Sequence, residues 1–379
     1  MHELDAMAWV FAGFLVVHGL IHLMGFAKAF GYAALPDLTT PISRAMGLAW
    51  LAAAALFLVA AVLVVVSPRT WWMVAGAAVL VSLCVVAAAW HDARFGALAN
   101  VVVAVGIAFG VLTAGPGSLR ARYEHDVRAA LAARVPDARH VSEADLASLP
   151  PPVQRYLRLA GAVGRPRVGA VRARMRGRIR SARDTVWMPL SAEQYDVFGA
   201  RPARLFYLTA SRALVPIQGF HRFVDGAASM RIEAIGLVPV MEQSGPVATQ
   251  AETVTLFNDI CMLAPAALLD APVTWLDAGT RDAAGRDVVR ARYAPDGRAI
   301  EAALVFDQDG RLVDFVSDDR SATSPDGTTM VPRRWSTPLL AYRRFGTATL
   351  ASRGEARWHE GVDSWAYIEL EFEAIEYLR

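Results

Sequence analysis

The stretch VGAVRARMRGRIRS, residues 168–181, decides how the larger part of this chain folds. Arginine occupies every second position from Arg172 to Arg180, and small or apolar side chains stand between. A twofold alternation of this kind is typical of an antiparallel strand with one face in a core and the other in solvent. The segment before it, residues 119–160, shows helical spacing instead. The chain therefore changes from helix to sheet near residue 166.

The same alternation recurs towards the end of the chain. The Asp-Gly pairs of APDG, residues 294–297, and DQDG, residues 307–310, are turn signals between such segments. AETVTLFNDICMLAPAALLD, residues 251–270, instead has apolar residues at helical spacing, and Pro265 should kink or end that helix. The further strands that we expect lie at 185–198, 203–211, 229–241, 287–294, 299–307, 311–319, 354–360 and 364–378. A curved sheet with one packed helix suggests a partly open barrel, which can enclose a cavity.

The first third of the chain has a different composition. Residues 1–119 hold four of the 38 Lys and Arg residues and four of the 36 Asp and Glu residues. Four uncharged runs lie roughly at 7–27, 45–66, 71–90 and 97–115. Each approaches or exceeds the ~20 apolar residues that cross a bilayer. Small residues are dense in these runs and favour close helix packing in lipid, so we expect a compact bundle of four membrane-spanning helices.

Together these patterns predict an α + β protein with a membrane anchor. We expect a four-transmembrane-helix domain at 1–118, a helical connector at 119–165 and a mostly antiparallel, curved β domain at 166–379. Because arginine replaces lysine almost everywhere and alanine is abundant, the composition is typical of GC-rich bacterial coding. The expected location is therefore the bacterial cytoplasmic membrane.

The side of the membrane that carries the β domain is less clear. With four crossings, both ends lie on one side, and that side carries Arg69, Arg120, Arg122, Arg128 and Arg134 against Lys28, Arg44 and Arg94 on the other. The positive-inside rule then slightly favours a cytoplasmic β domain. The first run argues for the opposite orientation, because it is acidic before and basic after.

His18 and His22 lie four residues apart in the first apolar run and thus on one face of a helix. Ionisable side chains inside a membrane are often functional, so a pair of metal or haem ligands, or a proton relay, is one interpretation. Further ligands would have to come from Cys84, His91 or Asp92. The alternative is hydrogen bonding by two neutral imidazoles, which we favour because no complete ligand set accompanies the pair.

Candidate ligand-binding residues lie in the β domain. Ligand pockets are mainly apolar with a few polar groups, so large aromatic side chains and isolated polar ones are the features to look for. The candidates for lining a cavity are Trp275, Trp335, Arg334, Tyr342, Trp358, Glu242 and Asn258. Ordinary core packing is the alternative for the aromatic residues.

Acid–base catalysis was weighed for polar residues embedded in apolar segments. His221, Glu252 and Asp259 are of this kind, as are Glu242 and Asn258. A buried carboxylate among them would have a raised pKa, as a general acid or base needs. They form no recognisable constellation, and GxSxG, HExxH, Walker A and GxGxxG motifs do not occur. The sequence therefore favours a protein without catalytic activity over an enzyme, and it does not indicate a cofactor.

The charge pattern argues against nucleic acid as a partner. The net charge is +2, and acidic residues alternate with the arginines instead of leaving a basic face. Membrane lipids and a hydrophobic small molecule are the partners that we expect.

Three segments carry a resemblance to a known group of proteins. They are HGLIHLMGFAKAF at 18–30, LPPPVQRYLRLAG at 149–161, and FVSDDR at 315–320 with PRRWSTPLLAYRRFG at 332–346. With the four apolar runs, the chain resembles an uncharacterised bacterial membrane-protein family of unknown function, and PPPVQRYLRLAG is its most specific motif. The strand pattern of the C-terminal half is also similar to half-barrel carriers of lipoproteins and lipids. That likeness concerns the fold, and a fold does not fix a function.

We therefore expect a membrane-anchored binding protein, whose β domain holds a lipid or another hydrophobic ligand near the membrane. One alternative is an integral-membrane metal, haem or proton-relay protein that uses His18 and His22. The second is a protein-interaction module.

Overall fold

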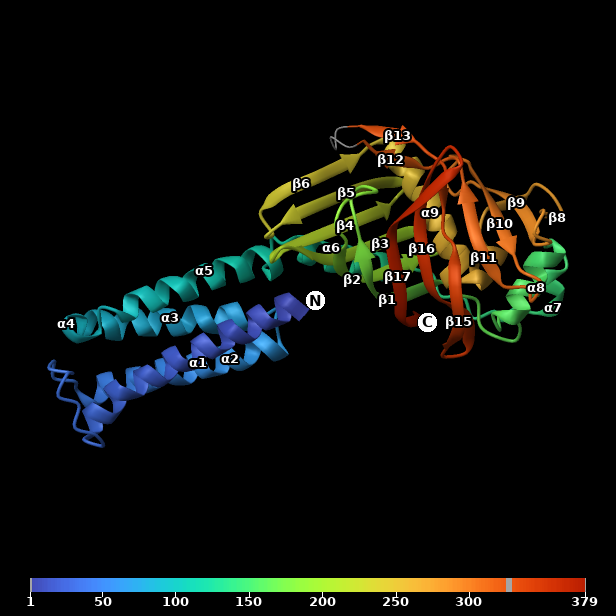
Figure 1. Ribbon diagram of the computed structural model, residues 1–379. Helices are drawn as coiled ribbons and strands as arrows, with labels where there is room; N and C mark the ends of the chain where they lie inside the picture. The colour runs from blue at the N-terminus through green and yellow to red at the C-terminus, as the bar shows by residue number, and fades with distance from the viewer. Residues whose placement is uncertain (1, 325–328, 379) are drawn as a thin grey trace. The chain divides into compact units, whose positions relative to one another are not determined.

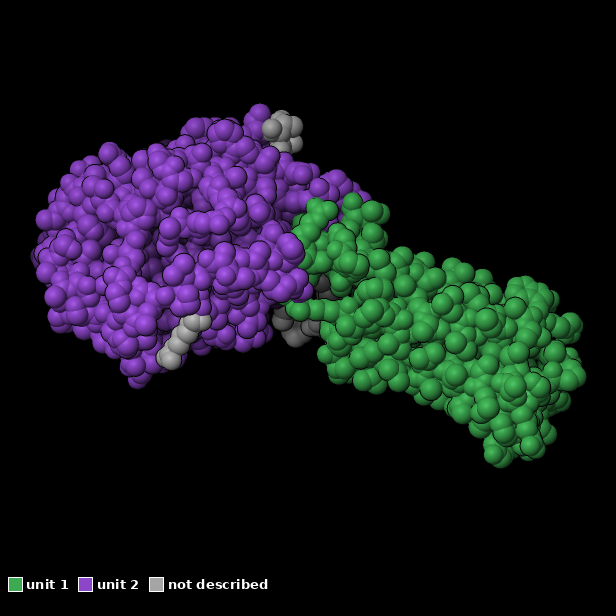
Figure 2. Space-filling model, turned by 180° about the vertical axis from the view of Figure 1, so that it is seen from behind, with its two compact units in different colours: residues 1–122, 214–216, 235–237 green, residues 123–213, 217–234, 238–379 purple. Residues whose placement is uncertain are grey.

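The computed structural model describes residues 2–324 and 329–378. These residues form two compact units, coloured separately in Figure 2. The helical unit holds residues 1–122 with the short segments 214–216 and 235–237. The β unit holds residues 123–213, 217–234 and 238–379.

Four helices of the helical unit are long and apolar enough to cross a membrane. They are α1 (His2–Phe30), α2 (Arg44–Val66), α3 (Trp71–Ala88) and α5 (Gly96–Ala114); the short α4 (Trp90–Ala93) stands between the last two. The prediction of four apolar helices is thereby confirmed. Gly25 marks a close approach of two helices, because a side chain there would meet the Trp50 ring.

Three shorter helices follow: α6 (Leu119–Ala132), α7 (Glu143–Leu146) and α8 (Pro151–Leu159). A reciprocal capping box between Ser142 and Asp145 begins α7, as its S-x-x-D sequence predicts. The motif PPPVQRYLRLAG forms α8, whose buried face carries Val153, Tyr156 and Leu157.

The β unit is built on one large antiparallel sheet (Figure 1). Its first strands are β1 (Ala170–Ile179), β2 (Met188–Val197), β3 (Ala203–Arg212), β4 (Val215–Val224), β5 (Ala227–Ala234) and β6 (Val238–Ser244). Next come β7 (Val273–Trp275), β8 (Thr280–Arg281), β9 (Asp287–Tyr293), β10 (Ile300–Phe306) and β11 (Leu312–Ser317). The last are β14 (Trp335–Ser336), β15 (Leu339–Phe345), β16 (Ala348–Glu360) and β17 (Asp363–Tyr377). The strands β12 (Ser321–Thr323) and β13 (Met330–Pro332) form a separate pair.

The large sheet is open. Its hydrogen-bonded order is β6–β5–β4–β3–β2–β1–β17–β16–β14–β11–β10–β9–β7, with β15 added to β16 and β8 to β9. Because the last strand, β17, pairs with β1, the chain's end lies in the middle of the sheet. Among the described residues β6 forms one edge of the sheet, and β7 and β8, both paired with β9, form the other. The expected fold class of four apolar helices followed by a curved antiparallel sheet with one packed helix is confirmed.

Strand β1 has the two faces that its arginine alternation predicts. Val171, Ala173 and Met175 are buried. On the other face Arg178 donates to Glu369 of β17, from Nε at 2.7 Å. Cross-strand ion pairs of this kind suit the solvent face of an antiparallel pair. Gly177 is needed for close pairing, because a Cβ there would collide with the carbonyl of Glu369.

The long helix α9 (Pro246–Leu263) packs against the sheet and is followed by the 3-10 helix η1 (Pro265–Leu269). The expected helix at 251–270 thus begins earlier and ends just before Pro265. It contacts strands from both ends of the sheet order, β5 and β6 as well as β10 and β11. From Ala251 to Leu263 every side chain is buried, so α9 forms the interior of the unit.

The sequence pattern did not predict several of the strands. The expected strand at 229–241 is a hairpin, β5 and β6, because Ile235 and Gly236 both have positive φ and turn the chain. The strands β7, β8 and β12 to β14 have two or three residues and are too brief to show alternation. Strand β15 is longer, but its sequence LLAYRRF does not alternate cleanly.

Candidate functional site

A cavity of about 120 Å³ lies between α9 and the middle strands of the sheet. Its walls are mainly apolar: Met175, Ile179, Leu208, Met262, Leu263, Leu339, Ala356, Ile368, Leu370 and Phe372. Polar side chains join them, namely Gln194, Arg204, His221, Glu252, Thr255, Asn258, Asp259, Arg320, Thr337 and Glu355. Apolar walls with a small group of convergent polar groups are the usual composition of a ligand site.

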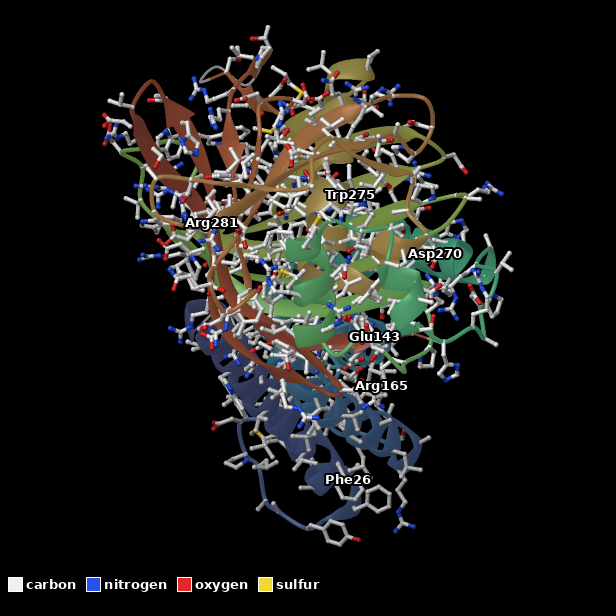
Figure 3. All side chains as sticks on the ribbon, turned by 90° about the vertical axis from the view of Figure 1, so that its right-hand side faces the viewer. Phe26, Glu143, Arg165, Asp270, Trp275 and Arg281 are labelled. Atoms are coloured by element: carbon white, nitrogen blue, oxygen red, sulfur yellow. The ribbon has the colours of Figure 1, made fainter. Side chains whose placement is uncertain are left out.

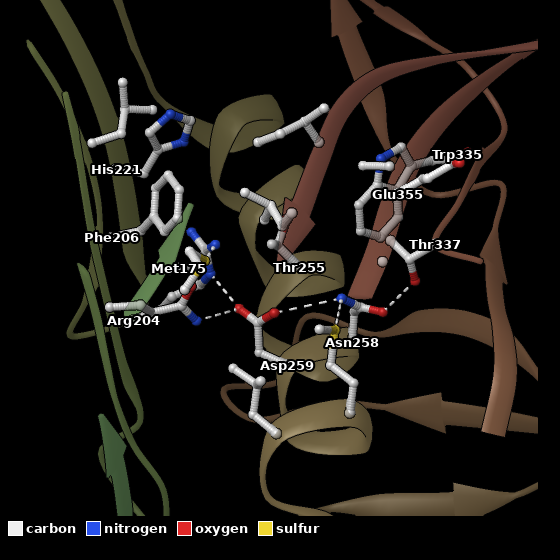
Figure 4. A pocket seen from close by; sticks show the side chains of 18 of the residues that line it. Met175, Arg204, Phe206, His221, Thr255, Asn258, Asp259, Trp335, Thr337 and Glu355 are labelled. Carbon is white, nitrogen blue, oxygen red and sulfur yellow. Dashed lines mark hydrogen bonds and ion pairs between the residues drawn. The ribbon is translucent and has the colours of Figure 1, made fainter. Parts of the chain in front are cut away.

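The polar groups are organised around Arg204 of β3 (Figure 4). Its Nε donates to Asp259 of α9 at 2.6 Å, and its Nη1 donates at 3.0 Å to Glu252, about two turns earlier on the same face of α9. The amide of Gln194 donates to Asp259 at 2.8 Å and to Asp196 at 2.7 Å. All five side chains are buried, so this cluster joins β2 and β3 to α9 without exposing its charges.

Asp196 is the least satisfied member of the cluster. Its Oδ1 has no hydrogen-bond partner among the described residues. Burial, together with the negative charge of Asp259, raises the pKa of Asp196 well above its usual range. A protonated Asp196 fits this position, because a neutral carboxyl costs far less to bury than a charged one.

Glu252 is held in its charged form by two arginines and a histidine. Burial opposes its charge, but Arg204, His221 and Arg320 outweigh burial and lower the pKa of Glu252 below its usual range. The Nδ1 atom of His221 lies 3.5 Å from Glu252, and Nη2 of Arg320 lies 3.9 Å from it. Glu252 is therefore a shared counter-ion for side chains of β3, β4 and the segment after β11.

Of the two arginines, Arg320 has the looser ion pairing. Its Nη1 donates to the carbonyl of Ala251 at 2.5 Å and to Thr255 Oγ1. Among the described residues, the carboxylate within 4 Å of it is that of Glu252, at 3.9 Å. The guanidinium lies 4.7 Å from the ring centre of Trp335 and 5.9 Å from that of Trp358. Aromatic faces stabilise a cation without neutralising it, so Arg320 can still accept an anionic partner.

The comparison with protein families concerns this same part of the chain. Residues 139–370, more than half of the sequence, match a family of unknown function. The chain belongs to this family, DUF6544. The matched range of DUF6544 runs from before α7 into β17 and contains every residue named above as lining the cavity except Phe372.

Two further comparisons add little to the DUF6544 assignment. No curated protein matches the chain. Among solved structures, the chain is similar to a putative outer membrane lipoprotein-sorting protein domain from Vibrio parahaemolyticus. The TM-score is 0.32 at 13% identity, over 55% of this chain and 85% of that one. A likeness of this size carries no argument about function.

Of the seven cavity candidates in this DUF6544 chain, Trp335 and Asn258 line the cavity. Asn258 Oδ1 accepts from Thr337 Oγ1 at 2.6 Å, and Trp335 Nε1 donates to the hydroxyl of Tyr367 at 3.1 Å. Trp358 does not line the cavity itself; its ring is stacked on that of Tyr367, which does, with 5.3 Å between the ring centres.

The other four candidates lie elsewhere. Trp275, labelled in Figure 3, is half-buried on the edge strand β7. Arg334 is largely exposed near Asp318, and Glu242 is exposed beside Arg231 on the opposite edge strand. The Tyr342 hydroxyl donates to a carbonyl of β11 at 2.7 Å. These positions serve packing and surface pairing and are not part of the cavity wall.

Sequence reasoning missed Arg204, Arg320 and Gln194, which organise the polar end. Arg204 left one signal, because it is the only charged residue in the apolar segment 203–211. A lone charge in a strand buried on both faces needs a buried counter-charge. Asp259, its partner, is 55 residues away along the chain.

In the helical unit, His18 and His22 belong to a closed ring of hydrogen bonds. His22 Nδ1 must donate to the His18 carbonyl at 2.8 Å, so in a neutral ring its Nε2 accepts from Ser82 Oγ at 2.8 Å. Ser82 in turn accepts from Asn100 Nδ2 at 2.9 Å, and Asn100 Oδ1 accepts from His18 Nε2 at 3.1 Å. All four hydrogen bonds can form at once with both imidazoles neutral.

The other ligands that were considered for His18 and His22 lie apart from this ring. Cys84 is exposed, and Asp92 accepts instead from Thr40 N at 2.7 Å. Within the described residues no group of three His, Cys, Asp or Glu side chains is placed to hold a metal ion.

Proposed function

We propose that this protein is a membrane-anchored binding protein, whose β unit takes the apolar part of a lipid or other hydrophobic molecule into the cavity beside α9. The observation that carries the proposal is the composition of that cavity, apolar walls ending in a buried cluster of charged groups. Four helices long and apolar enough to cross a membrane support the anchor.

The volume limits what enters. An apolar protein cavity of about 150 Å³ takes up benzene. At about 120 Å³, the cavity holds a group of that size or the end of one acyl chain, in the conformation described. A longer ligand therefore inserts one end, or it enters with some separation of α9 from the sheet.

The polar end favours a ligand with an anionic group. Arg204 is fully engaged by Asp259 and Glu252. Arg320 instead donates to two neutral acceptors, the Ala251 carbonyl and Thr255 Oγ1, and its contact to the Glu252 carboxylate is long, at 3.9 Å. A carboxylate or phosphate would give Arg320 a charge-assisted hydrogen bond of the stronger kind. The proposed ligand is thus an amphiphile, with its apolar end among Leu208 and Leu370 and its anionic end at Arg320.

Photo-crosslinking of the full chain in detergent tests this proposal. The probe is palmitic acid with a diazirine near the methyl end, and labelled peptides are identified by mass spectrometry. We expect labels on strands that line the cavity and on α9. Labels confined to the four apolar helices would contradict the proposal, because any lipid probe reaches those.

Two variants, each with an alanine replaced by leucine, make the test specific. Ala356 is buried in the cavity wall, so Ala356→Leu fills the space and should reduce β-unit labelling at least several-fold. Ala303 on β10 is only half-buried and does not line the cavity, so Ala303→Leu is the matched control. Thermal unfolding of both variants shows that they fold. Equal labelling of the two folded variants would overturn the proposal.

A third variant tests the anionic end. Arg320→Gln should weaken labelling by the carboxylate probe far more than labelling by a hexadecanol probe with the same diazirine. A structural loss would affect both probes alike, and that result would exclude a head-group role for Arg320.

The metal or haem alternative is less well supported, because both nitrogens of His22 and one of His18 already have hydrogen-bond partners. An absorption spectrum and a metal analysis of the whole protein decide it. A Soret band or one bound metal per chain that His22→Ala abolishes would establish this alternative.

A further inference from the structure

Two neighbouring turns of the sheet carry apolar residues where turns are normally polar. The β3–β4 turn is built on Ala213 and Leu214, and the β5–β6 turn on Ile235 and Gly236, all with positive φ. They are adjacent, since the Ile235 amide donates to the carbonyl of Pro216 at 2.8 Å. Asn, Asp and Gly are the residues that such turns prefer.

The sequence Leu-Val-Pro occurs at both turns, as residues 214–216 at the first and 237–239 at the second. Its side chains are not buried by the chain: Leu214 is 51% exposed and Leu237 is 58% exposed. Val238 and Val240 on the edge strand extend the same exposed surface. No charged residue lies between 213 and 217 or between 234 and 241.

The opposite end of the same strands provides an internal comparison. The β4–β5 turn has the same two positive φ angles, at Asp225 and Gly226, and there the sequence is the polar Asp-Gly pair. The fold therefore does not require apolar turn residues. An isoleucine at φ +50° adds backbone strain to the cost of exposing its side chain to water. A turn that only faced water would therefore give no reason for an isoleucine at position 235.

Parts of both turns are grouped with the helical unit. Residues 214–216 and 235–237 group with the helices that are apolar enough to cross a membrane, whereas the strands that carry these turns belong to the β unit. The chain that carries these turns also has four helices long and apolar enough to cross a membrane, so a bilayer is an available partner for apolar turn residues.

From these observations we propose that the two Leu-Val-Pro turns insert into the head-group and upper acyl region of a lipid bilayer. Apolar side chains immersed at this depth lose their contact with water, as in interfacial anchors. The flanking Arg212, which is exposed, can reach lipid phosphates. This inference rests on the proposed membrane anchor but is independent of ligand binding.

Spin labels in the full chain test it, in nanodiscs of phosphatidylcholine. Leu214→Cys and Leu237→Cys are each made with Cys84→Ala, and Cys261 is buried, so that each variant carries one reactive thiol. The readout is the ratio of label collisions with oxygen, which concentrates in lipid, to collisions with a water-soluble nickel chelate.

Two reference sites give the collision ratios expected in lipid and in water. The native Cys84 is exposed on α3 and reports the lipid value. Val362→Cys reports the water value, because Val362 is a fully exposed apolar residue in another turn, between Gly361 and Asp363. We expect the labels at 214 and 237 to give ratios several-fold above Val362→Cys and approaching that of Cys84.

Each other outcome has a definite meaning. Ratios at 214 and 237 equal to that of Val362→Cys, with a lipid-like Cys84, overturn the insertion and leave the anchor intact. Labels that are immobile and shielded from both reagents overturn it too, because the turns are then covered by protein. A water-like Cys84 instead contradicts the membrane anchor itself.

Discussion

The hydroxyl of Tyr156 donates a 2.9 Å hydrogen bond to the carbonyl oxygen of Cys261 and so ties α8 to the last turn of α9. The hydroxyl of Tyr377 does the same for Leu263, at 3.1 Å. The last carbonyls of a helix have no partner within it, and buried ones must find one elsewhere. The motif PPPVQRYLRLAG thus supplies an end cap for the helix that lines the cavity.

Tyr156→Phe should therefore destabilise the β unit. Tyr156 is fully buried, so removal of its hydroxyl leaves the Cys261 carbonyl without its partner, a loss of about 1–3 kcal/mol in the free energy of unfolding. Denaturant unfolding of the full chain measures it. Tyr32→Phe is the control, because Tyr32 is largely exposed in the helical unit and should unfold like the parent.

Arg204→Met should cost considerably more. Removing one partner of a buried ion pair typically costs about 3–5 kcal/mol, because the remaining charge stays buried and unpaired. Here both Asp259 and Glu252 lose their main cation. Arg201→Met, which breaks the exposed pair with Asp225, should leave unfolding unchanged. If Arg204→Met with Asp259→Asn is no more stable than Arg204→Met alone, the explanation by unpaired charge is wrong.

Asp314 should make stability depend on pH. Burial raises the pKa of Asp314 to about 6, above its value of 3.8 in an unfolded chain. The folded protein therefore binds this proton more tightly, and the native state loses stability as the pH rises from about 4 to about 6.

Asp314→Asn removes that loss. The variant should be the more stable protein at pH 7.5, by up to about 3 kcal/mol, and its advantage should vanish at pH 4. Thermal unfolding of both proteins across this range gives the difference directly. An advantage that does not change with pH would contradict the assignment.

Ser82→Ala should weaken the helical unit. The change removes the hydroxyl that joins His22 to Asn100, two hydrogen bonds of about 1 kcal/mol or less each inside a membrane bundle. Unfolding of the full chain in mixed micelles by added dodecyl sulfate measures the loss. Cys84→Ala, two residues along the same helix and exposed, should have no such effect.

Much of the fold could be predicted because it depends on local pattern. Uninterrupted apolar runs marked the four helices, alternation marked β1 and its neighbours, and the proline-rich motif marked α8. Strand β4 was missed, since VPIQGFHRFV shows no clean alternation. The β5–β6 hairpin was missed because Ile-Gly is not a recognised turn pair.

The candidate site depends on contacts that local pattern does not contain. Trp335 and Asn258 were identified by residue type alone. Arg204 meets Asp259 only because α9 crosses the sheet, and His22 of α1 meets Ser82 of α3 only in the folded helical unit. A sequence spacing of 55 or 60 residues carries no trace of such pairs.

The unbroken burial of α9 from Ala251 to Leu263 has an evolutionary consequence. A helix with a solvent face can vary freely on that face, which leaves a period of 3.6 residues in its tolerance of mutation. From Ala251 to Leu263 the chain has no such face. A deep mutational scan should therefore show an unbroken block of intolerance there, and descendants of this sequence can change α9 only through paired substitutions with the strands around it.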